Sequence, residues 1–283
     1  MLITTDRDER LLPVHVEPGI VYGTADGIAL SGDYYRPETA AAVPVVVVVH
    51  GGGWKLGSAR FYQHWGPYLA ARGIALFAID YRLVEGGEHR YPAAVEDVVA
   101  AVGFVRANAA RLGIDPQRVG LVGDSAGAHL ATLAALGGNP AAGDDGPPLD
   151  VRAVVAVYGV YDLVAQWQHD LVARPDDQIT EIFMGHSPLD DRLRFLAASP
   201  LSHVTRRSRG TAFLVAWGTA DDVVEWQSQS QPFVTALKQV GCFVRTLAFT
   251  DAPHFWMSDP LDDPYGYPIR LAPGLLRFLR ECL

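Results

Sequence analysis

The chain has 283 residues, 49% of them hydrophobic, and a formal net charge of −9. This acidic balance disfavours nucleic acid and anionic membranes as partners, and no run approaches the about 20 apolar residues of a membrane span. The first ten residues are polar and lack the hydrophobic core of a signal peptide, so a cytoplasmic location is expected. The two cysteines lie apart and no metal-binding or phosphate-binding motif occurs, so no metal and no cofactor are expected.

The predicted elements alternate between strands and helices. Residues 12–35 alternate apolar and polar side chains around Ala25-Asp26-Gly27, which predicts an antiparallel edge hairpin. Valines at positions 95, 98, 99 and 102 form a helical stripe, and residues 126–136 are rich in alanine and leucine. Apolar runs predict buried strands at 45–49, 73–79, 118–122, 152–158, 211–217 and 243–249. This alternation predicts a mostly parallel α/β sheet with helices on both faces.

Two segments interrupt this rhythm within what we expect to be a single domain, residues 1–283. Residues 137–150 are rich in glycine, proline and aspartate, and predict a surface loop. Residues 160–209 are far longer than a usual connection and contain helix-like stretches near 176–184 and 189–198. We expect this insertion to form a short helical cap or one wall of a pocket.

The candidate nucleophile lies in Gly123-Asp124-Ser125-Ala126-Gly127, between a predicted strand and a predicted helix. A serine hydroxyl is a poor nucleophile unless it is held exposed beside a base. The G-x-S-x-G turn holds the serine on a strained backbone, while its glycines let strand and helix approach closely. Ser125 is therefore the predicted nucleophile.

A base and a group that orients it are expected after later strands, in the order Ser, acid, His. Asp221 and Asp222 follow the strand that ends near Trp217, at the carboxyl edge where open α/β sheets place their sites. His254 follows the next strand and is the only histidine after residue 221. We therefore expect His254 to be the base and one of the two aspartates to orient it.

Backbone amides are expected to stabilise the oxyanion that forms during acyl transfer. One donor is the N–H of Ala126, the residue after the nucleophile, and others come from His50-Gly51-Gly52-Gly53-Trp54, which follows the valine strand. Glycines let the main chain approach a substrate carbonyl closely. Gly52 and Gly53 are the expected donors.

In combination, HGGGW at 50–54 and GDSAG at 123–127 resemble the esterases and lipases of the α/β-hydrolase fold. Asp80-Tyr81-Arg82-Leu83, Tyr91-Pro92-Ala93 and Asp97 also match a stretch common in that superfamily. The two motifs occur in hormone-sensitive-lipase-like enzymes, but Gly218-Thr219-Ala220-Asp221-Asp222-Val223-Val224 is more similar to the acetyl-esterase and feruloyl-esterase-like group. That pattern implies Asp221 as the acid, with Asp222 as the alternative.

Other residues near these motifs have weaker assignments. We expect His129 and His203 to be structural, since both precede the acid, and His50 to hold the glycine loop by hydrogen bonding. Five aromatic residues adjoin the motifs and are candidates for lining a substrate pocket. They are Trp54, Tyr158, Tyr161, Phe255 and Trp256.

The resemblance implies hydrolysis of a small carboxylic ester through a covalent acyl-enzyme, without cofactor. The acid loop, similar to that of short-chain esterases, and the polar character of residues 166–170 and 188–194 favour short acyl groups. An arylformamidase or amidase with the same triad is the alternative, because these residues do not reveal the leaving group. A non-catalytic binding protein on this fold is a further alternative.

Overall fold

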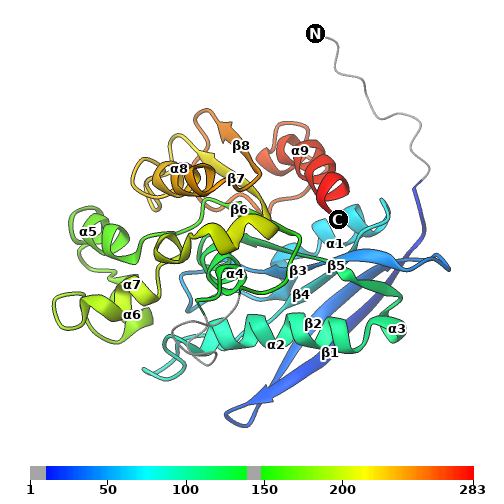
Figure 1. The fold of residues 1–283 in the computed structure, drawn as a ribbon, viewed down its shortest axis with the longest axis horizontal. Coiled ribbons are helices and arrows are strands. Elements are labelled where there is room, and N and C mark those ends of the chain that lie inside the picture. The colour runs from blue at the N-terminus through cyan, green and yellow to red at the C-terminus, as the bar shows by residue number, and fades with distance from the viewer. Residues whose placement is uncertain (1–10, 139–147) are drawn as a thin grey trace.

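The computed structural model describes residues 11–138 and 148–283, so most of the predicted 137–150 loop lies outside the described residues. The described chain contains an eight-stranded sheet with the order β1-β2-β4-β3-β5-β6-β7-β8 (Figure 1). Strands β3 to β8 are parallel, whereas β2 pairs antiparallel with β1 and β4. The predicted α/β-hydrolase architecture is confirmed. The strands are β1 Val14–Ala25, β2 Ile28–Pro37, β3 Val43–Val49, β4 Ala75–Ile79, β5 Ile114–Asp124, β6 Ala153–Val157, β7 Ala212–Gly218 and β8 Val244–Phe249.

The valine run of β3 shows why the sheet is covered on both faces. Val45, Val47 and Val49 point to one core cluster, and Val46 and Val48 to the other, and all five are buried. A strand in the interior of a parallel sheet has no solvated face, which explains an unbroken apolar run in place of alternation. Because these strands are packed on both faces, the loops that follow their carboxyl ends are held in fixed positions.

Helices form a layer on each face of the sheet (Figure 1). Side chains of α2, α4 and α8 pack in one core cluster, and those of α1 and α9 pack in the other. The helices outside the insertion are α1 Trp65–Ala70, α2 Ala93–Ala107, α3 Ala109–Leu112, α4 Ala126–Leu136, α8 Ser230–Val240 and α9 Tyr267–Cys282, with a 3-10 turn η1 at Ala59–Tyr62.

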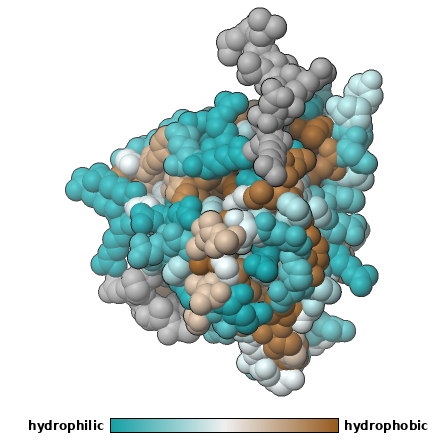
Figure 2. Space-filling view, turned by 90° about the vertical axis from the view of Figure 1, so that its right-hand side faces the viewer, coloured by the Kyte–Doolittle hydropathy of each residue, from teal (hydrophilic) through white to brown (hydrophobic). Residues whose placement is uncertain are grey.

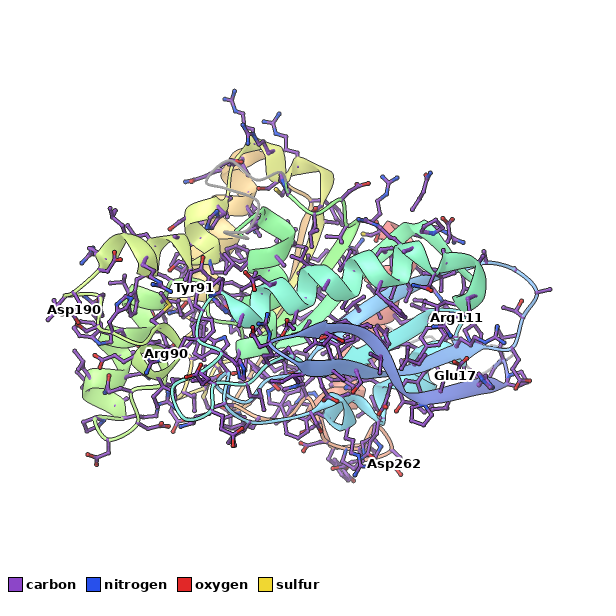
Figure 3. The ribbon with its side chains drawn as sticks, turned by 90° about the horizontal axis from the view of Figure 1, so that it is seen from below. Glu17, Arg90, Tyr91, Arg111, Asp190 and Asp262 are labelled. Atoms are coloured by element: carbon purple, nitrogen blue, oxygen red, sulfur yellow. The ribbon has the colours of Figure 1, made fainter. Side chains whose placement is uncertain are left out.

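The N-terminal hairpin of β1 and β2 forms one edge of the sheet, as predicted from residues 12–35. Its turn residues Asp26 and Gly27 both have positive φ, 51° and 76°, as the tightest hairpin turns require. Glu17 Oε2 of β1 lies 3.5 Å from Arg111 Nη1 of α3, and this contact joins the hairpin to the helical layer (Figure 3).

Figure 2 shows the molecule from the right-hand side of Figure 1, and on that face hydrophobic residues lie between hydrophilic ones.

Strand β5 begins earlier than the sequence predicts. The predicted strand starts at residue 118 and the preceding Asp115-Pro116 is expected to turn, but the observed strand starts at Ile114. Ile114 pairs with Val43, and the pairing resumes at Val119 after a register shift. The irregularity accommodates the proline, which cannot donate to the ladder.

The insertion of residues 160–209 lies beside the carboxyl ends of the strands, at the left of Figure 1. It contains α5 Leu163–Ala173, α6 Ile179–Met184, α7 Arg192–Ala197, and the 3-10 turns η3 Pro200–His203 and η4 Arg206–Gly210. Figure 3 shows Arg90 and Tyr91 beside it and Asp190 at its outer edge. The N–H of Tyr91 donates to the Phe183 carbonyl at 3.0 Å, and Arg194 donates to the Tyr91 carbonyl at 2.9 Å. These two hydrogen bonds hold the insertion against the segment that precedes α2.

Among the described residues, no helix combines the length and the apolar character that a membrane crossing needs.

Candidate active site

Ser125 occupies the sharp turn between β5 and α4. Its φ of 52° and ψ of −121° lie outside the regions that serine normally adopts, which is the strained geometry expected of a nucleophile elbow. A Cβ on Gly123 would lie 2.4 Å from the Gly127 carbonyl oxygen, and one on Gly127 would lie 2.0 Å from the Val49 oxygen. Both flanking glycines are therefore required for the strand and the helix to approach this closely.

His254 connects Ser125 to Asp221 through two short hydrogen-bond contacts. Its Nε2 lies 2.9 Å from Ser125 Oγ, and its Nδ1 lies 2.7 Å from Asp221 Oδ2. A carboxylate only accepts, so Nδ1 carries the proton and Nε2 is free to accept from the serine hydroxyl. All three residues are buried. This arrangement has the geometry of the hydrogen-bonded Ser–His–Asp chain that activates a serine for acyl transfer in serine hydrolases.

Asp221 is fixed from behind by the main chain. Its Oδ1 accepts from the N–H groups of Val223 at 3.0 Å and Val224 at 2.9 Å, which leaves Oδ2 directed at the imidazole. Asp222 is exposed, and its carbonyl oxygen lies 2.9 Å from His169 Nε2. The structure thus brings Asp221, and not Asp222, to His254.

The glycine loop, residues 50–54, lies beside Ser125 in an unusual backbone conformation. Gly52, Gly53 and Trp54 have φ values of 120°, 59° and 60°. A Cβ on Gly52 would lie 2.2 Å from the Leu56 carbonyl oxygen, so only glycine fits there. Gly52, Gly53 and Ala126 line the same cavity as Ser125, which places the three predicted amide donors together.

Asp124 holds the glycine loop against the elbow. Its Oδ1 accepts from the Gly51 N–H at 3.0 Å and from the Tyr62 hydroxyl at 2.7 Å, and its Oδ2 lies 3.4 Å from the Tyr158 hydroxyl. Burial raises the pKa of this carboxyl, while the bonds from Tyr62 and Gly51 act in the opposite direction. Asp124, the residue before Ser125, thus links the glycine loop to the G-x-S-x-G turn, two motifs that the sequence identifies separately.

A cavity of about 130 Å³ opens beside Ser125. Its wall is mainly apolar, with one charged stretch in which Lys55 Nζ lies 2.8 Å from Asp177 Oδ1, and Arg174 lies beside them. The lining residues are Gly52, Gly53, Trp54, Lys55, Leu56, Ser125, Ala126, Val160, Arg174, Asp177, Ile179, Val223, Val224 and Phe255.

The structure brings two of the five candidate aromatic residues to this cavity, Trp54 and Phe255. Tyr158 instead packs beneath His254, with ring centroids 4.5 Å apart, and its hydroxyl accepts from the Met257 N–H at 2.9 Å. Tyr161 stacks on Phe233, and Trp256 packs edge-to-face on Tyr158. These three support the core around the site.

The sequence does not identify the cavity residues that come from the insertion, which are Val160, Arg174, Asp177 and Ile179. No local motif marks them, because their position depends on how α5 and α6 fold back on the sheet edge. Within the described residues, no group of three or more His, Cys, Asp or Glu side chains is arranged to hold a metal ion.

A mostly parallel sheet with a Ser–His–Asp chain at its carboxyl edge defines the α/β-hydrolase fold, in the class that contains the serine esterases. Within that class the chain belongs to the BD-FAE family, whose model matches residues 33–237. The sequence resemblance to this group of esterases is therefore confirmed.

Curated relatives carry esterase names. The chain is 32% identical over 243 residues to Esterase LipQ of Mycobacterium tuberculosis, covering 83% of this chain and 55% of the relative. It is 34% identical over 214 residues to Esterase LipC of the same organism, covering 70% of this chain and 49% of the relative. The chain thus spans about half the length of these relatives.

Solved structures share nearly the whole fold. Propionate-bound esterase Est2 of Thermogutta terrifontis has a TM-score of 0.75 at 26% identity, with 95% of this chain and 94% of that chain covered. An acetyl ester-xyloside bifunctional hydrolase from Caldicellulosiruptor lactoaceticus has a TM-score of 0.76 at 21% identity, covering 93% of this chain and 95% of that one, and shows the fold alone.

Proposed function

We propose that the protein hydrolyses short-acyl carboxylic esters through a covalent acyl-enzyme on Ser125. The observation that carries this proposal is the continuous contact from Ser125 Oγ through His254 to Asp221. Ser125, His254 and Asp221 are all buried, and the half-buried Gly52 and Gly53 line the same cavity as Ser125.

In the acylation step, His254 Nε2 takes the proton of Ser125 while Oγ attacks the ester carbonyl carbon. The amides of Gly52, Gly53 and Ala126 donate to the oxygen that becomes negatively charged. Asp221 holds the imidazole and stabilises the imidazolium. His254 then returns the proton to the departing alcohol as the carbon–oxygen bond breaks, which leaves the acyl group on Ser125.

In the deacylation step, a water molecule replaces the alcohol. His254 takes a proton from the water as it attacks the acyl carbon, and the same amides hold the second oxyanion. Collapse releases the carboxylic acid and returns the proton to Ser125 Oγ. With the ester and one water molecule as reactants, these protein groups account for every proton transfer in both steps.

The cavity volume supports short acyl groups. An engineered apolar cavity of about 150 Å³ holds one benzene molecule, so about 130 Å³ beside Ser125 suits an acyl chain of about four to six carbons. Two similar solved structures are of Est2 with propionate bound and with butyrate bound. We further propose that the insertion acts as a short cap, because Val160, Arg174, Asp177 and Ile179 form one wall of the cavity.

A p-nitrophenyl ester series from acetate to palmitate tests the substrate class. We expect a maximum between acetate and hexanoate, and loss of several orders of magnitude in kcat for Ser125→Ala. Thr235→Ala removes an exposed hydroxyl on α8 and is the matched control. A maximum at laurate or longer would contradict the short-acyl assignment, and Ser125→Ala activity above about a tenth of wild type would contradict the nucleophile.

Two further assays address the alternatives. Parallel rates on acyl esters and N-formylkynurenine separate an esterase from a formamidase with the same triad. Failure of Ser125 to react with a fluorophosphonate probe would favour a non-catalytic binding protein on this fold.

A further inference from the structure

The His129 imidazole links three parts of the site that are distant in sequence. It lies on α4 one turn after Ser125, with its backbone N–H donating to the Ser125 carbonyl at 3.0 Å. The Trp54 Nε1–H donates to His129 Nδ1 at 3.1 Å, and His129 Nε2 lies 2.8 Å from the Ala198 carbonyl oxygen. Trp54 closes the glycine loop, and Ala198 follows α7 in the insertion.

These contacts allow only one protonation state. An indole nitrogen can only donate, so His129 Nδ1 must accept and Nε2 must carry the proton that is donated to Ala198. The imidazole is fully buried, so both ring nitrogens depend on these partners. Burial lowers the pKa of His129 to about 4, which keeps the ring neutral at ordinary pH.

Trp54 needs such support, because its backbone is in the left-handed region with φ of 60°. For a bulky residue this conformation persists only when the surroundings enforce it. Its ring stacks on Phe183 at 4.5 Å, and its carbonyl accepts from the Val84 N–H at 2.9 Å. The indole nitrogen, which is the polar atom of the Trp54 side chain, is hydrogen-bonded to His129. Trp54 directly follows Gly53, so the position of its ring affects the backbone of the glycine loop.

We propose that His129 is a positioning residue that fixes the glycine loop through Trp54 and thereby aims the Gly53 amide at the reacting carbonyl oxygen. The inference rests on the proposed function, since it concerns the oxyanion donors of that reaction. His129 transfers no proton, because both its nitrogens are engaged away from Ser125. Its effect is on the alignment of the transition-state contacts, where a shift of about 1 Å can cost about 100-fold in rate.

The test compares three variants with p-nitrophenyl butyrate, well below their melting temperatures. His129→Leu removes both hydrogen bonds, and we expect kcat to fall about 10-fold to 100-fold with KM changed less than about threefold. His129→Gln restores one acceptor and one donor and should recover part of kcat. His203→Leu is the control, because half-buried His203 lies 2.7 Å from the carbonyl oxygen of Ala197, the residue before Ala198, within the insertion.

A trifluoromethyl ketone inhibitor separates positioning from a merely structural role. Its tetrahedral adduct uses the oxyanion donors, so its inhibition constant should rise in His129→Leu by about the same factor as kcat falls. A structural role would lower the melting temperature without this parallel change. If His129→Leu does not fold, Trp54→Phe removes the N–H donor together with part of the ring, leaves His129 in place, and gives the same comparison of kcat with the inhibition constant.

The possible results separate a failure of the proposed esterase activity from a failure of the proposed role of His129. A wild-type protein that hydrolyses no ester overturns the proposed function. An active wild type together with folded His129→Leu or Trp54→Phe variants that keep kcat within about twofold, and bind the ketone normally, overturns the role of His129. A kcat loss of similar size in His203→Leu would also overturn it, because the effect would then belong to the insertion in general.

Discussion

Gly53 offers a direct test of the glycine loop, because the structure leaves space where a side chain would go. A Cβ built on Gly53 meets only Ile179 Cγ2, at 3.8 Å, whereas one on Gly52 would lie 2.2 Å from a backbone oxygen. Gly53→Val should therefore fold with the loop displaced or the cavity obstructed. Gly52→Val would force the main chain to move and would confound stability with activity.

Gly53→Val should have a large effect on kcat and a small effect on the melting temperature. Loss of one oxyanion donor is worth about 3–4 kcal/mol in the transition state, so kcat should fall roughly 10²-fold to 10³-fold. The φ of 59° strains any residue with a Cβ by about 1–2 kcal/mol. That strain corresponds to a drop in Tm of only a few degrees, since about 1 kcal/mol shifts Tm by roughly 2–4 °C at this size.

Gly73→Val is the matched control for this experiment. Gly73 has a φ of 86°, and a Cβ there meets no atom within 4 Å, in the turn before β4. The same backbone strain should lower Tm without lowering kcat. The assay is steady-state hydrolysis of p-nitrophenyl butyrate with melting followed by circular dichroism. A well-folded Gly53→Val variant with near-normal kcat would show that the glycine loop is only a structural turn.

Two further outcomes are expected. Asp221→Asn should lower kcat far more than Asp222→Asn, because an amide cannot stabilise the imidazolium, and the reverse ranking in the same ester assay would reassign the acid. Burial lowers the pKa of His50 and His129 to about 4, so their stabilising contribution is complete above about pH 6.5 and is lost as the pH falls towards 4. Urea titrations between pH 7 and 4.5 give the slope of the unfolding free energy against pH. This slope should be smaller in His129→Gln than in wild type, by up to about 1.4 kcal/mol per pH unit. An unchanged slope would show that burial does not keep the His129 ring neutral.

The sequence predicts the elements whose pattern is local. The valines of β3 are buried on both faces, and the helix over 126–136 has the bounds predicted for it. Asp26 and Gly27 turn where their composition predicts. In contrast, the sequence does not predict α5, because the buried face of this helix also carries the polar side chains of Gln166 and Asp170, which form a network with Arg174.

The candidate site divides in the same way. Ser125 and His254 lie in recognisable turns after predicted strands, so their proximity follows from the parallel order of the sheet. The resemblance to the Gly-x-x-Asp-x-x-Val pattern implies Asp221 with Asp222 as the alternative, and in the structure Asp221 is the aspartate in contact with His254. Tyr158, Tyr161 and Trp256 adjoin motifs along the chain, but their rings pack into the core, since neighbours in sequence need not face the same cavity.

Ser125 and His254 follow strands that differ in how well they are protected from local opening. Ser125 follows β5, which has a partner strand on each side, whereas His254 follows β8, the edge strand with several half-exposed or exposed residues. Edge strands open by local fluctuation at lower free energy than central ones. We therefore expect breathing of β8 to move His254 away while the turn at Ser125 stays folded. Activity would then be lost at a lower opening free energy than that of the whole domain.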